Sequence, residues 1–388
     1  MLSVCMDISI VLCLMLQDVG TLPDVDRLID VVRTADGWER VAALEQITEM
    51  GPRAVKAVPV LVERLRTPSD DSSLEAGALI AIGKPAIVPL EALLADMQAS
   101  ARARAFAATA LGLIGPPSLD VLINALDDEE VEVRCAATAG LGYTQREEAM
   151  ASLVKAANDE HADVRRCAAV SIGEIGVQPE LALRTLGRLL NDNEEWVRIK
   201  AAEAMRNYPR DLDIALPYLV DATRDRCLIV RTEAIHGLRL IAERHETARA
   251  AIVDRLKDPL WEVRLAAAMA IGDIGPKYVE AVPELVDVIV WNGPSVLDRF
   301  SAIRALESIG PDAFAALPVL RKVASDHPDE YFREAADSAI AQIAGSNQME
   351  GCNRCVPKDP GEGGMRTNKC RHAIRDGRRL RRASARRR

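Results

Sequence analysis

The residues best suited to chemistry lie near the end of the 388-residue chain. Two residues separate Cys352 from Cys355, and 14 residues separate that pair from Cys370 and His372. Four soft ligands of this kind can hold Zn²⁺ tetrahedrally. The second pair, however, is one residue shorter than the usual ligand spacing. We therefore predict no metal site and no cofactor, with these four residues as the alternative ligand set.

A run of arginines follows the cysteines and could bind nucleic acid or another polyanion. Arginine–phosphate contacts release counterions, so such binding would weaken with salt. Two alternatives are that the run folds back on an acidic body, or that it comes from a frame-shifted, GC-rich reading frame. The candidate polyanion-binding residues are Arg378, Arg379, Arg381, Arg382, Arg386, Arg387 and Arg388.

The net charge of −9 conceals a strong division along the chain. Residues 346–388 hold 13 Lys and Arg against 4 Asp and Glu, a net charge of +9. The preceding residues hold the other 36 basic and 54 acidic side chains, a net charge of −18. Since residues 346–388 also lack aromatic residues and an apolar period, their composition predicts a disordered tail.

Other features exclude several protein classes. The eight cysteines are too scattered for a disulfide scaffold, and Cys135, Cys167 and Cys227 are expected to be small buried thiols. No apolar stretch reaches the roughly 18 to 20 residues of a membrane span. The start of the chain is apolar from Ile8 to Leu16 but has no basic residue before Arg27. We therefore favour an orphan helix over an export signal there, and expect a cytoplasmic protein unless residues 1–20 are a signal peptide.

One repeated sequence motif predicts the secondary-structure elements of the chain. It reads Asp, a few residues, Val-Arg, two residues, Ala-Ala and an apolar pair, as in Asp258–Gly275. The arginines recur at intervals of 30–35 residues, with Ser72 in one arginine place. A fixed period of this length predicts a solenoid. The arginines are at positions 40, 104, 134, 165, 198, 231, 264, 299 and 333.

Each period predicts two antiparallel helices. The first begins with proline in its first turn, where the missing N–H would be unpaired anyway. In the second, the Asp is expected at the N-cap, apolar residues recur at steps of three and four, and glycine ends the helix. The prolines are Pro59, Pro89, Pro217, Pro283 and Pro318.

The first-helix proline, the turn aspartate and the Val-Arg that follows it resemble the HEAT repeat. The short period is similar to the HEAT-like repeats of bilin lyases, and the resemblance covers roughly residues 8–344. It implies an all-α fold, a right-handed, armadillo-like α-solenoid of about ten antiparallel helix pairs. We expect residues 1–20 to be an orphan helix or signal segment, residues 21–345 the solenoid and residues 346–388 the basic tail.

The resemblance also extends to enzymes that are built from HEAT-like repeats. Bilin lyases attach or isomerise a tetrapyrrole, but no catalytic residue transfers from them to this chain. Deoxyhypusine hydroxylase holds iron with several His-Glu pairs, whereas here only His245-Glu246 forms one. A di-iron site needs several converging ligands. HExxH, P-loop and GxSxG motifs are also absent. We therefore expect a non-catalytic protein, with a lyase-like or hydroxylase-like enzyme or chaperone subunit as the alternative.

The regular Asp and Arg residues have two interpretations. The HEAT resemblance favours a structural one, in which each Asp accepts hydrogen bonds from backbone N–H groups and from the arginine of a neighbouring repeat. The other interpretation is a charged binding track.

The resemblance also implies that the second helices line the concave side of the solenoid. Positions two before, one after and five after each Arg point away from the core face, where exposed apolar residues would mark a groove for a protein partner. The alternative is that they pack over adjacent repeats. The predicted partner-binding residues are Trp196, Ile199, Glu203, Thr232, His236, Leu265, Met269, Phe300 and Arg304.

Three tryptophans begin second helices: Trp38, Trp196 and Trp261. We expect each ring to cover the turn beneath it, with contact to a partner as the alternative. Together these patterns predict a monomeric scaffold or adaptor that binds a protein partner.

Overall fold

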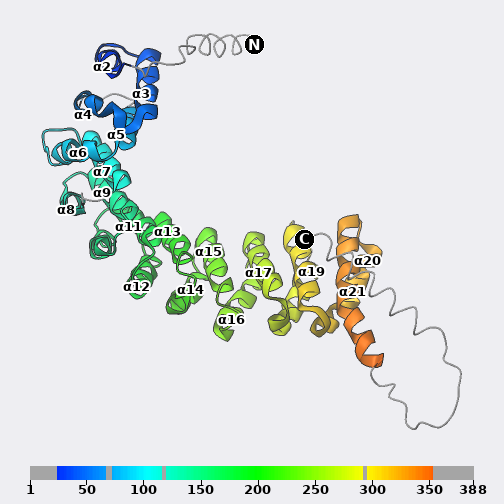
Figure 1. The fold of residues 1–388 in the computed structure, drawn as a ribbon. Coiled ribbons are helices and arrows are strands. Elements are labelled where there is room, and N and C mark those ends of the chain that lie inside the picture. Colours follow the sequence, from blue (N-terminus) through cyan, green and yellow to red (C-terminus); the bar gives the residue numbers. More distant parts are fainter. Residues whose placement is uncertain (1–23, 67–71, 116–118, 292–294, 353–388) are drawn as a thin grey trace, which may run out of the picture. The chain divides into compact units, whose positions relative to one another are not determined.

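The computed structural model describes residues 24–66, 72–115, 119–291 and 295–352. Within these ranges the chain forms 20 α-helices and short 3-10 helices, with no strand (Figure 1). The predictions for residues 1–20 lie outside the described residues. So do the candidate ligands Cys355, Cys370 and His372, the arginine run and the predicted disorder beyond residue 352.

The α-helices alternate between two positions in each repeat, which gives ten pairs among the described residues. The first helices are α2 (Val25–Thr34), α4 (Val58–Arg66), α6 (Ile87–Leu94), α8 (Leu119–Asn124), α10 (Met150–Ala156), α12 (Pro179–Leu189), α14 (Leu216–Ala222), α16 (Glu246–Asp254), α18 (Val282–Val290) and α20 (Leu317–Asp326). The second helices are α3 (Trp38–Met50), α5 (Ser72–Ile82), α7 (Ala101–Ile114), α9 (Val131–Tyr143), α11 (Ala162–Ile175), α13 (Glu195–Met205), α15 (Leu228–Arg239), α17 (Trp261–Ile274), α19 (Leu297–Ile309) and α21 (Glu330–Cys352). The 3-10 helices are η1 (Gly51–Ala57), η2 (Lys84–Ala86), η3 (Ala125–Asp127), η4 (Glu147–Ala149), η5 (Leu212–Ala215), η6 (Arg255–Lys257), η7 (Gly275–Ala281) and η8 (Gly310–Ala316).

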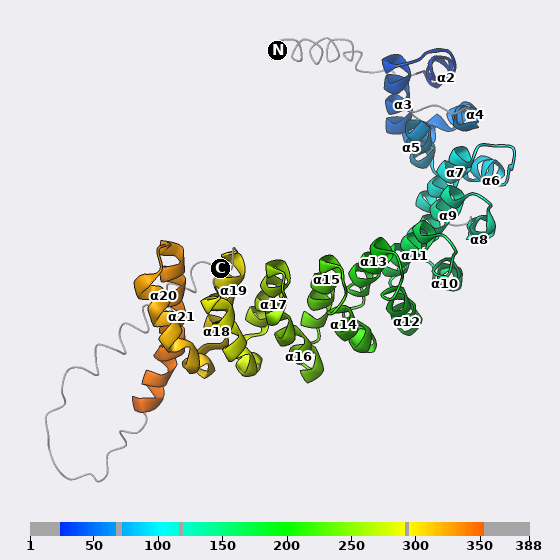
Figure 2. The ribbon, with the colours of Figure 1, turned by 180° about the vertical axis from the view of Figure 1, so that it is seen from behind.

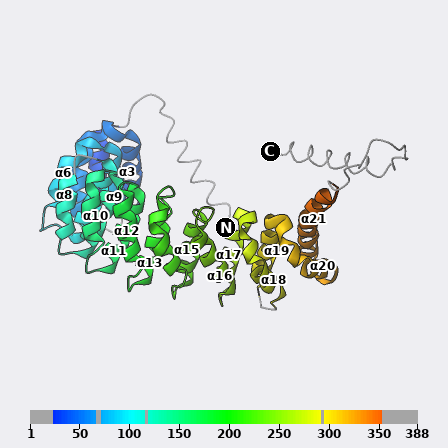
Figure 3. The same ribbon diagram turned by 90° about the horizontal axis from the view of Figure 1, so that it is seen from below.

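The second helices form one continuous layer. Each of α3 to α17 packs against the next second helix along the chain, and each also packs against the first helix of its own repeat. Figures 1 and 2 show this second-helix layer on one side of the row and the first helices on the other, and Figure 3 shows the repeats following one another in chain order. The described residues therefore form an all-α solenoid.

Local signals in the sequence mark several of the helix ends. Pro217, Pro283 and Pro318 stand in the first turns of α14, α18 and α20. Gly275 and Gly310 end α17 and α19 with φ values of +64° and +77°, which a side chain would disfavour.

The prediction that Asp is the N-cap of the second helix was wrong. Asp258 lies two residues before Leu260, the N-cap of α17, and its Oδ1 accepts the Leu260 N–H at 3.0 Å. Asp192 and Asp225 do the same in their repeats. The carboxylate closes the turn before the helix, and this leaves its oxygens in reach of the preceding repeat.

Small residues bring consecutive second helices close together. A Cβ on Gly112 of α7 would lie 2.4 Å from the Cα of Gly140 in α9, and a Cβ on Gly142 would lie 2.7 Å from the Cβ of Ser171 in α11. These contacts define what we call the seam, the contact between consecutive second helices. A Cβ on Gly173 of α11 would likewise lie 2.8 Å from the Cβ of Ala204 in α13.

The chain divides into two compact units, the first ending at Ile343 and the second beginning at Ala344. Helix α21 continues past Gly345, where we expected the repeats to end, and ends at Cys352. Among the described residues no single helix is long and apolar enough to cross a membrane. The pair Ser73–Ile82 and Lys84–Leu94, bent by 120°, passes by length and composition alone.

Candidate protein-binding surface

The Asp and Arg residues form a regular set of contacts between repeats, which we call the ladder. At six places the guanidinium group of an Arg binds an Asp of the next repeat, with shortest N–O distances of 2.6–2.9 Å; five of these aspartates lie in the turn before the second helix, and Asp298 lies in the first turn of α19. The structural interpretation of these residues is thereby confirmed at six places. The pairs are Arg104–Asp128, Arg134–Asp159, Arg165–Asp192, Arg198–Asp225, Arg231–Asp258 and Arg264–Asp298.

Each ladder arginine also holds its own turn. Arg198 donates from Nη1 to the carbonyl oxygens of Asp192 and Asn193, at 2.9 and 3.1 Å. Its Nε and Nη2 donate to the two carboxylate oxygens of Asp225, at 2.8 and 3.1 Å. Arg198 is 3% exposed, so its donors are committed within the protein. Such an arginine has no free guanidinium edge for a ligand.

The ladder changes the acidity of its carboxylates. Burial raises the pKa values of Asp159 and Asp192, but the hydrogen bonds from Arg134 and Arg165 and from backbone N–H groups outweigh it. The pKa values of both carboxyls therefore lie below the ordinary value. Both groups are ionised at neutral pH and serve as fixed acceptors.

One ladder contact uses an arginine that the repeat pattern does not indicate. Ser72 occupies the arginine place of its repeat. Arg66, in the last turn of α4, instead donates to the carboxylate of Asp96, the turn aspartate of the next repeat. The hydrogen bond from Arg66 lowers the pKa of Asp96. A basic residue six positions before the missing arginine was the available signal.

The predicted partner-binding residues divide into two groups by exposure. Trp196, Met269 and Arg304 are exposed, the first two at 62% and 58%. Glu203, Thr232, His236, Leu265 and Phe300 are half-buried. Burial lowers the pKa of His236, which favours its neutral form. Phe300 packs edge-on against Phe332, with ring centroids 5.7 Å apart.

Ile199 was a wrong prediction, because it is 2% exposed. It follows Arg198 by one residue, and the position seven residues later lies on the same face of the helix. In the preceding repeats this later position is occupied by Gly142 and Gly173, both in contact with the next second helix. Ile199 therefore lies on the side of α13 that packs into the seam.

Met269 and Arg304 line a groove between the second helices, whereas Trp196 does not. A cavity of about 570 Å³ lies between α17 and α19 and reaches α21, and a smaller one of about 130 Å³ lies between α15 and α17. Both are lined by Met269 and Asp273, so they are parts of one feature, the α15–α21 groove. The polar and exposed side chains that line it are His236, Arg239, Met269, Asp273, Ser301, Arg304, Glu307, Ser308 and Gln342.

The charges of the groove are paired with each other. Arg239 binds Asp273 at 2.6 Å, and Arg304 binds Glu307. Ser308 donates to the carbonyl oxygen of Gly272 at 2.5 Å. The groove therefore presents an exposed methionine surrounded by ion pairs and hydroxyl groups, an arrangement typical of an interface centre with a polar rim.

Large apolar side chains are also exposed at the start of several second helices. Five repeats carry such a residue, exposed, two positions before the repeat arginine: Trp38, Trp196, Ile229, Leu297 and Tyr331. Trp38 and Trp196 are 73% and 62% exposed. The prediction that each ring covers the turn beneath it is therefore wrong for these two residues. Trp261 is half-buried.

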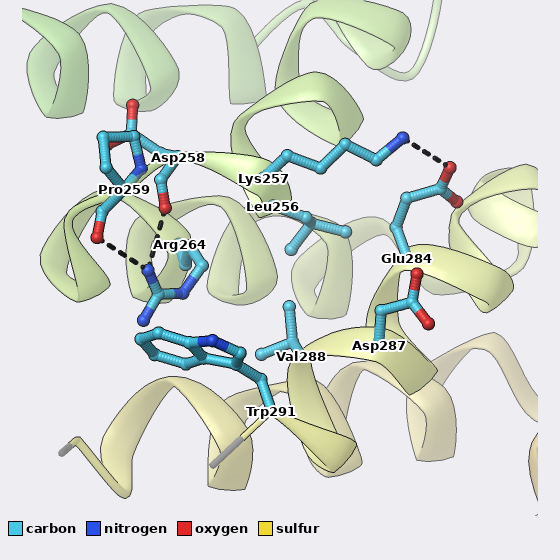
Figure 4. A pocket seen from close by; sticks show the side chains of 9 residues that line it. All are labelled: Leu256, Lys257, Asp258, Pro259, Arg264, Glu284, Asp287, Val288 and Trp291. Atoms are coloured by element: carbon cyan, nitrogen blue, oxygen red, sulfur yellow. Dashed lines mark hydrogen bonds and ion pairs between the residues drawn. The ribbon is translucent and has the colours of Figure 1, made fainter. Parts of the chain in front are cut away.

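A further cavity of about 280 Å³ lies at the ladder itself (Figure 4). The Arg264 guanidinium lies 4.1 Å from the ring centroid of Trp291, and Lys257 pairs with Glu284 at 3.2 Å on the other side. Arg264 already binds Asp298 and the carbonyl oxygens of Asp258 and Pro259. The Arg264 guanidinium in this cavity is therefore already paired through the ladder.

The histidine considered for iron binding has a structural contact. His245 is the N-cap residue of α16, and its Nε2 lies 2.9 Å from Oδ1 of Asp213, which also binds Arg244. Among the residues that the structure describes, no group of three or more His, Cys, Asp or Glu side chains is placed to hold a metal ion.

Known proteins share both the sequence pattern and the fold. The HEAT repeats family model matches residues 119–206 and 216–296, and the PBS lyase HEAT-like repeat model matches residues 103–128. No curated protein sequence matches the chain.

Two solved structures share the fold at low identity. Kap95p, in a structure with RanGDP, is 15% identical with a TM-score of 0.63, and importin beta is 13% identical with a TM-score of 0.59. They match 87% and 86% of this chain, which spans 55% of each of theirs. Human deoxyhypusine hydroxylase is 22% identical over 67% of this chain and 96% of its own, with a TM-score of 0.31. The described helix pairs form a repeat scaffold, and the chain is a HEAT-repeat protein with repeats of the PBS lyase HEAT-like type.

Proposed function

We propose that this chain is a non-catalytic scaffold that binds a protein partner on its second-helix layer, centred on the α15–α21 groove. The observation that carries the proposal is Met269, a flexible apolar side chain that is 58% exposed in the floor of a groove. Exposed apolar groups in a concave, polar-rimmed site are typical of protein interfaces.

The composition of the surface also supports binding rather than catalysis. The ladder arginines are committed to turns and carboxylates, and the groove charges are paired, as described above. Groups that are already paired contribute orientation and specificity to an interface, whereas apolar anchors contribute most of the affinity. The exposed side chains of Trp196, Ile229 and Leu297 would extend such an interface beyond the groove.

Related solenoids support the same reading. Kap95p, whose fold this chain shares, binds RanGDP in the structure compared above. Kap95p and this chain are only 15% identical, so this likeness supports a protein-binding solenoid in general and not the same partner.

The test compares two variants that introduce the same charge, one in the second-helix layer and one among the first helices. Met269→Asp places a charge in the groove, and Val88→Asp places the same charge on α6, where Val88 is 73% exposed among the first helices. Each tagged chain is used to capture proteins from the cells that make it. The captured partner is then purified, and its Kd is measured for each variant.

We expect Met269→Asp to weaken the Kd by about 30-fold or more, the effect of losing a hot-spot residue of about 2 kcal/mol. Val88→Asp should bind like the unaltered chain, and both variants should melt within a few degrees of it. A partner lost with Val88→Asp but kept with Met269→Asp would place the interface on the first helices and refute the proposal.

A further inference from the structure

Two cysteines face each other across one seam. Cys135 in α9 lies seven residues before Gly142, and Cys167 in α11 lies four residues before Ser171. Residues seven or four apart share a face of a helix. Since Gly142 and Ser171 touch, both cysteines lie on the sides of α9 and α11 that face each other.

The helices approach closely enough for the two side chains to meet. At Gly142 there is no room for a Cβ beside Ser171, and Ser171 donates from Oγ to the carbonyl oxygen of Thr138 in α9 at 3.0 Å. A disulfide needs Cα atoms only about 4.4–6.8 Å apart, a separation that such close helix packing permits. The contact between Cys135 and Cys167 shifts the pKa of each thiol, in opposite directions.

We infer that Cys135 and Cys167 form a peroxide-sensitive thiol pair, which oxidises to a disulfide that links the repeats of α9 and α11. Both side chains are half-buried, contrary to the buried thiols expected from the sequence, so a small oxidant can reach them. Cys227, by contrast, is buried and donates to Glu195 at 3.2 Å.

The two thiols differ in reactivity. The hydrogen bond from Cys135 lowers the pKa of Cys167, and the positive charge of Arg166 lowers it further. The same contact with Cys167 raises the pKa of Cys135. Because the thiolate is the nucleophile, Cys167 is the thiol that attacks and Cys135 the one that resolves.

The chemistry balances with a peroxide as the oxidant. The Cys167 thiolate attacks one oxygen of hydrogen peroxide, takes up that OH as a sulfenic acid and, with one proton, releases water. The Cys135 sulfur then attacks the Cys167 sulfur, which releases the OH as a second water and forms the S–S bond. Overall, two thiols lose two hydrogens and one peroxide becomes two waters.

Peptide mapping of the full chain tests the inference. Trypsin cleaves after Arg134, Arg146, Arg166 and Arg184, so the two cysteines fall in the peptides 135–146 and 167–184. After treatment with limiting peroxide and alkylation, we expect these peptides joined and two hydrogens lighter than their sum, and separate again after dithiothreitol. Cys227 should stay alkylated in its own peptide.

Two variants check the assigned roles in the full chain. In Cys135→Ser, dimedone should trap a sulfenic acid on the 167–184 peptide, because no thiol remains to resolve it. In Cys167→Ser, the 135–146 peptide should gain far less dimedone. Peptides that stay separate in the oxidised wild-type chain, or that join to other cysteines, would overturn the pair. Equal trapping in the two variants would overturn the division of roles.

Discussion

At the scale of single residues, the ladder arginines show why two similar ion pairs differ in their contribution to stability. The side chains of Arg198 and Asp225 are 4% and 13% exposed, whereas those of Arg184 and Glu180 are 66% and 59% exposed. Solvent screens the second pair but not the first, and removing one member of a buried pair leaves its partner charged and unpaired.

We therefore predict that Arg198→Ala lowers the free energy of unfolding by about 3–5 kcal/mol. The matched variant Arg184→Ala should lower it by less than about 1 kcal/mol. Urea denaturation of both variants measures the difference. Equal and small losses would mean that the ladder does not hold the repeats together.

The ladder carboxylates also predict the response to acid. The folded-state pKa values of Asp159 and Asp192 are lowered, so their contribution to stability is complete above the unfolded pKa near 3.9. It is lost as the pH falls from there through the folded values. The melting temperature should fall steeply below about pH 4, where the unfolded chain binds more protons.

A carboxamide variant isolates this effect. Asp192→Asn should be less stable at neutral pH but lose less stability on acidification than the wild-type chain. Asp30→Asn, at an exposed site, is the control for the loss of one carboxylate. Thermal melting from pH 7 to pH 3 gives all three slopes, and parallel curves for wild type and Asp192→Asn would contradict the assignment.

At the scale of helices, packing depends on where glycine stands. Gly112 in α7 has the Cα of Gly140 2.4 Å from where its Cβ would be, whereas a Cβ on Gly77 in α5 would meet nothing within 4 Å. The same substitution therefore has opposite effects at the two sites.

Gly112→Ala should lower the free energy of unfolding by about 1–3 kcal/mol or more, because the obstructing atoms are backbone and cannot move aside. Gly77→Ala should raise it by about 0.5–1 kcal/mol, the ordinary gain when alanine replaces glycine inside a helix. Denaturation curves of the two variants should shift in opposite directions. A loss at both sites would show that the seam is not the cause.

The helices show how far the sequence alone could lead. The period, Pro217 and Gly275 predicted paired helices, because these signals act within one turn. Ile199 was misplaced because its burial depends on the neighbouring repeat, which a single helical period does not describe. A signal was present: glycine recurs eight residues after the arginine at Gly112, Gly142 and Gly173, where only small residues fit.

The groove could be predicted only in part, for the same reason. Met269 and Arg304 were each found from the register of their own helix, α17 and α19. Asp273, Glu307 and Ser308 were missed, because the cavity lies between helices and depends on their spacing. The partner-binding role of all these residues stays a prediction.

At the scale of the molecule, each repeat is stabilised by contacts with the repeats next to it. Each described second helix from α5 to α17 packs on those before and after it, so the array behaves as a row of units with nearest-neighbour coupling. A defect should therefore remain local.

Hydrogen exchange measures this locality. Arg198→Ala breaks the contact between the repeats of α13 and α15, and amide protection in these helices should fall more than in α3 and α5. The same measurement on Arg184→Ala provides the control. An equal loss along the whole array would indicate a single cooperative unit.

The ladder finally bears on how such a chain can change its length. Arg165, Arg198 and Arg231 each reach an aspartate 27 residues ahead, and the aspartates themselves recur every 33 residues from Asp159 to Asp258. A duplicated segment of residues 192–224 would bring its own donor and its own acceptor, so both new junctions would be filled. The junction of Arg264 with Asp298, at a distance of 34 residues, follows a different rule. Gene duplication can therefore lengthen the array within its middle repeats without inventing a new contact.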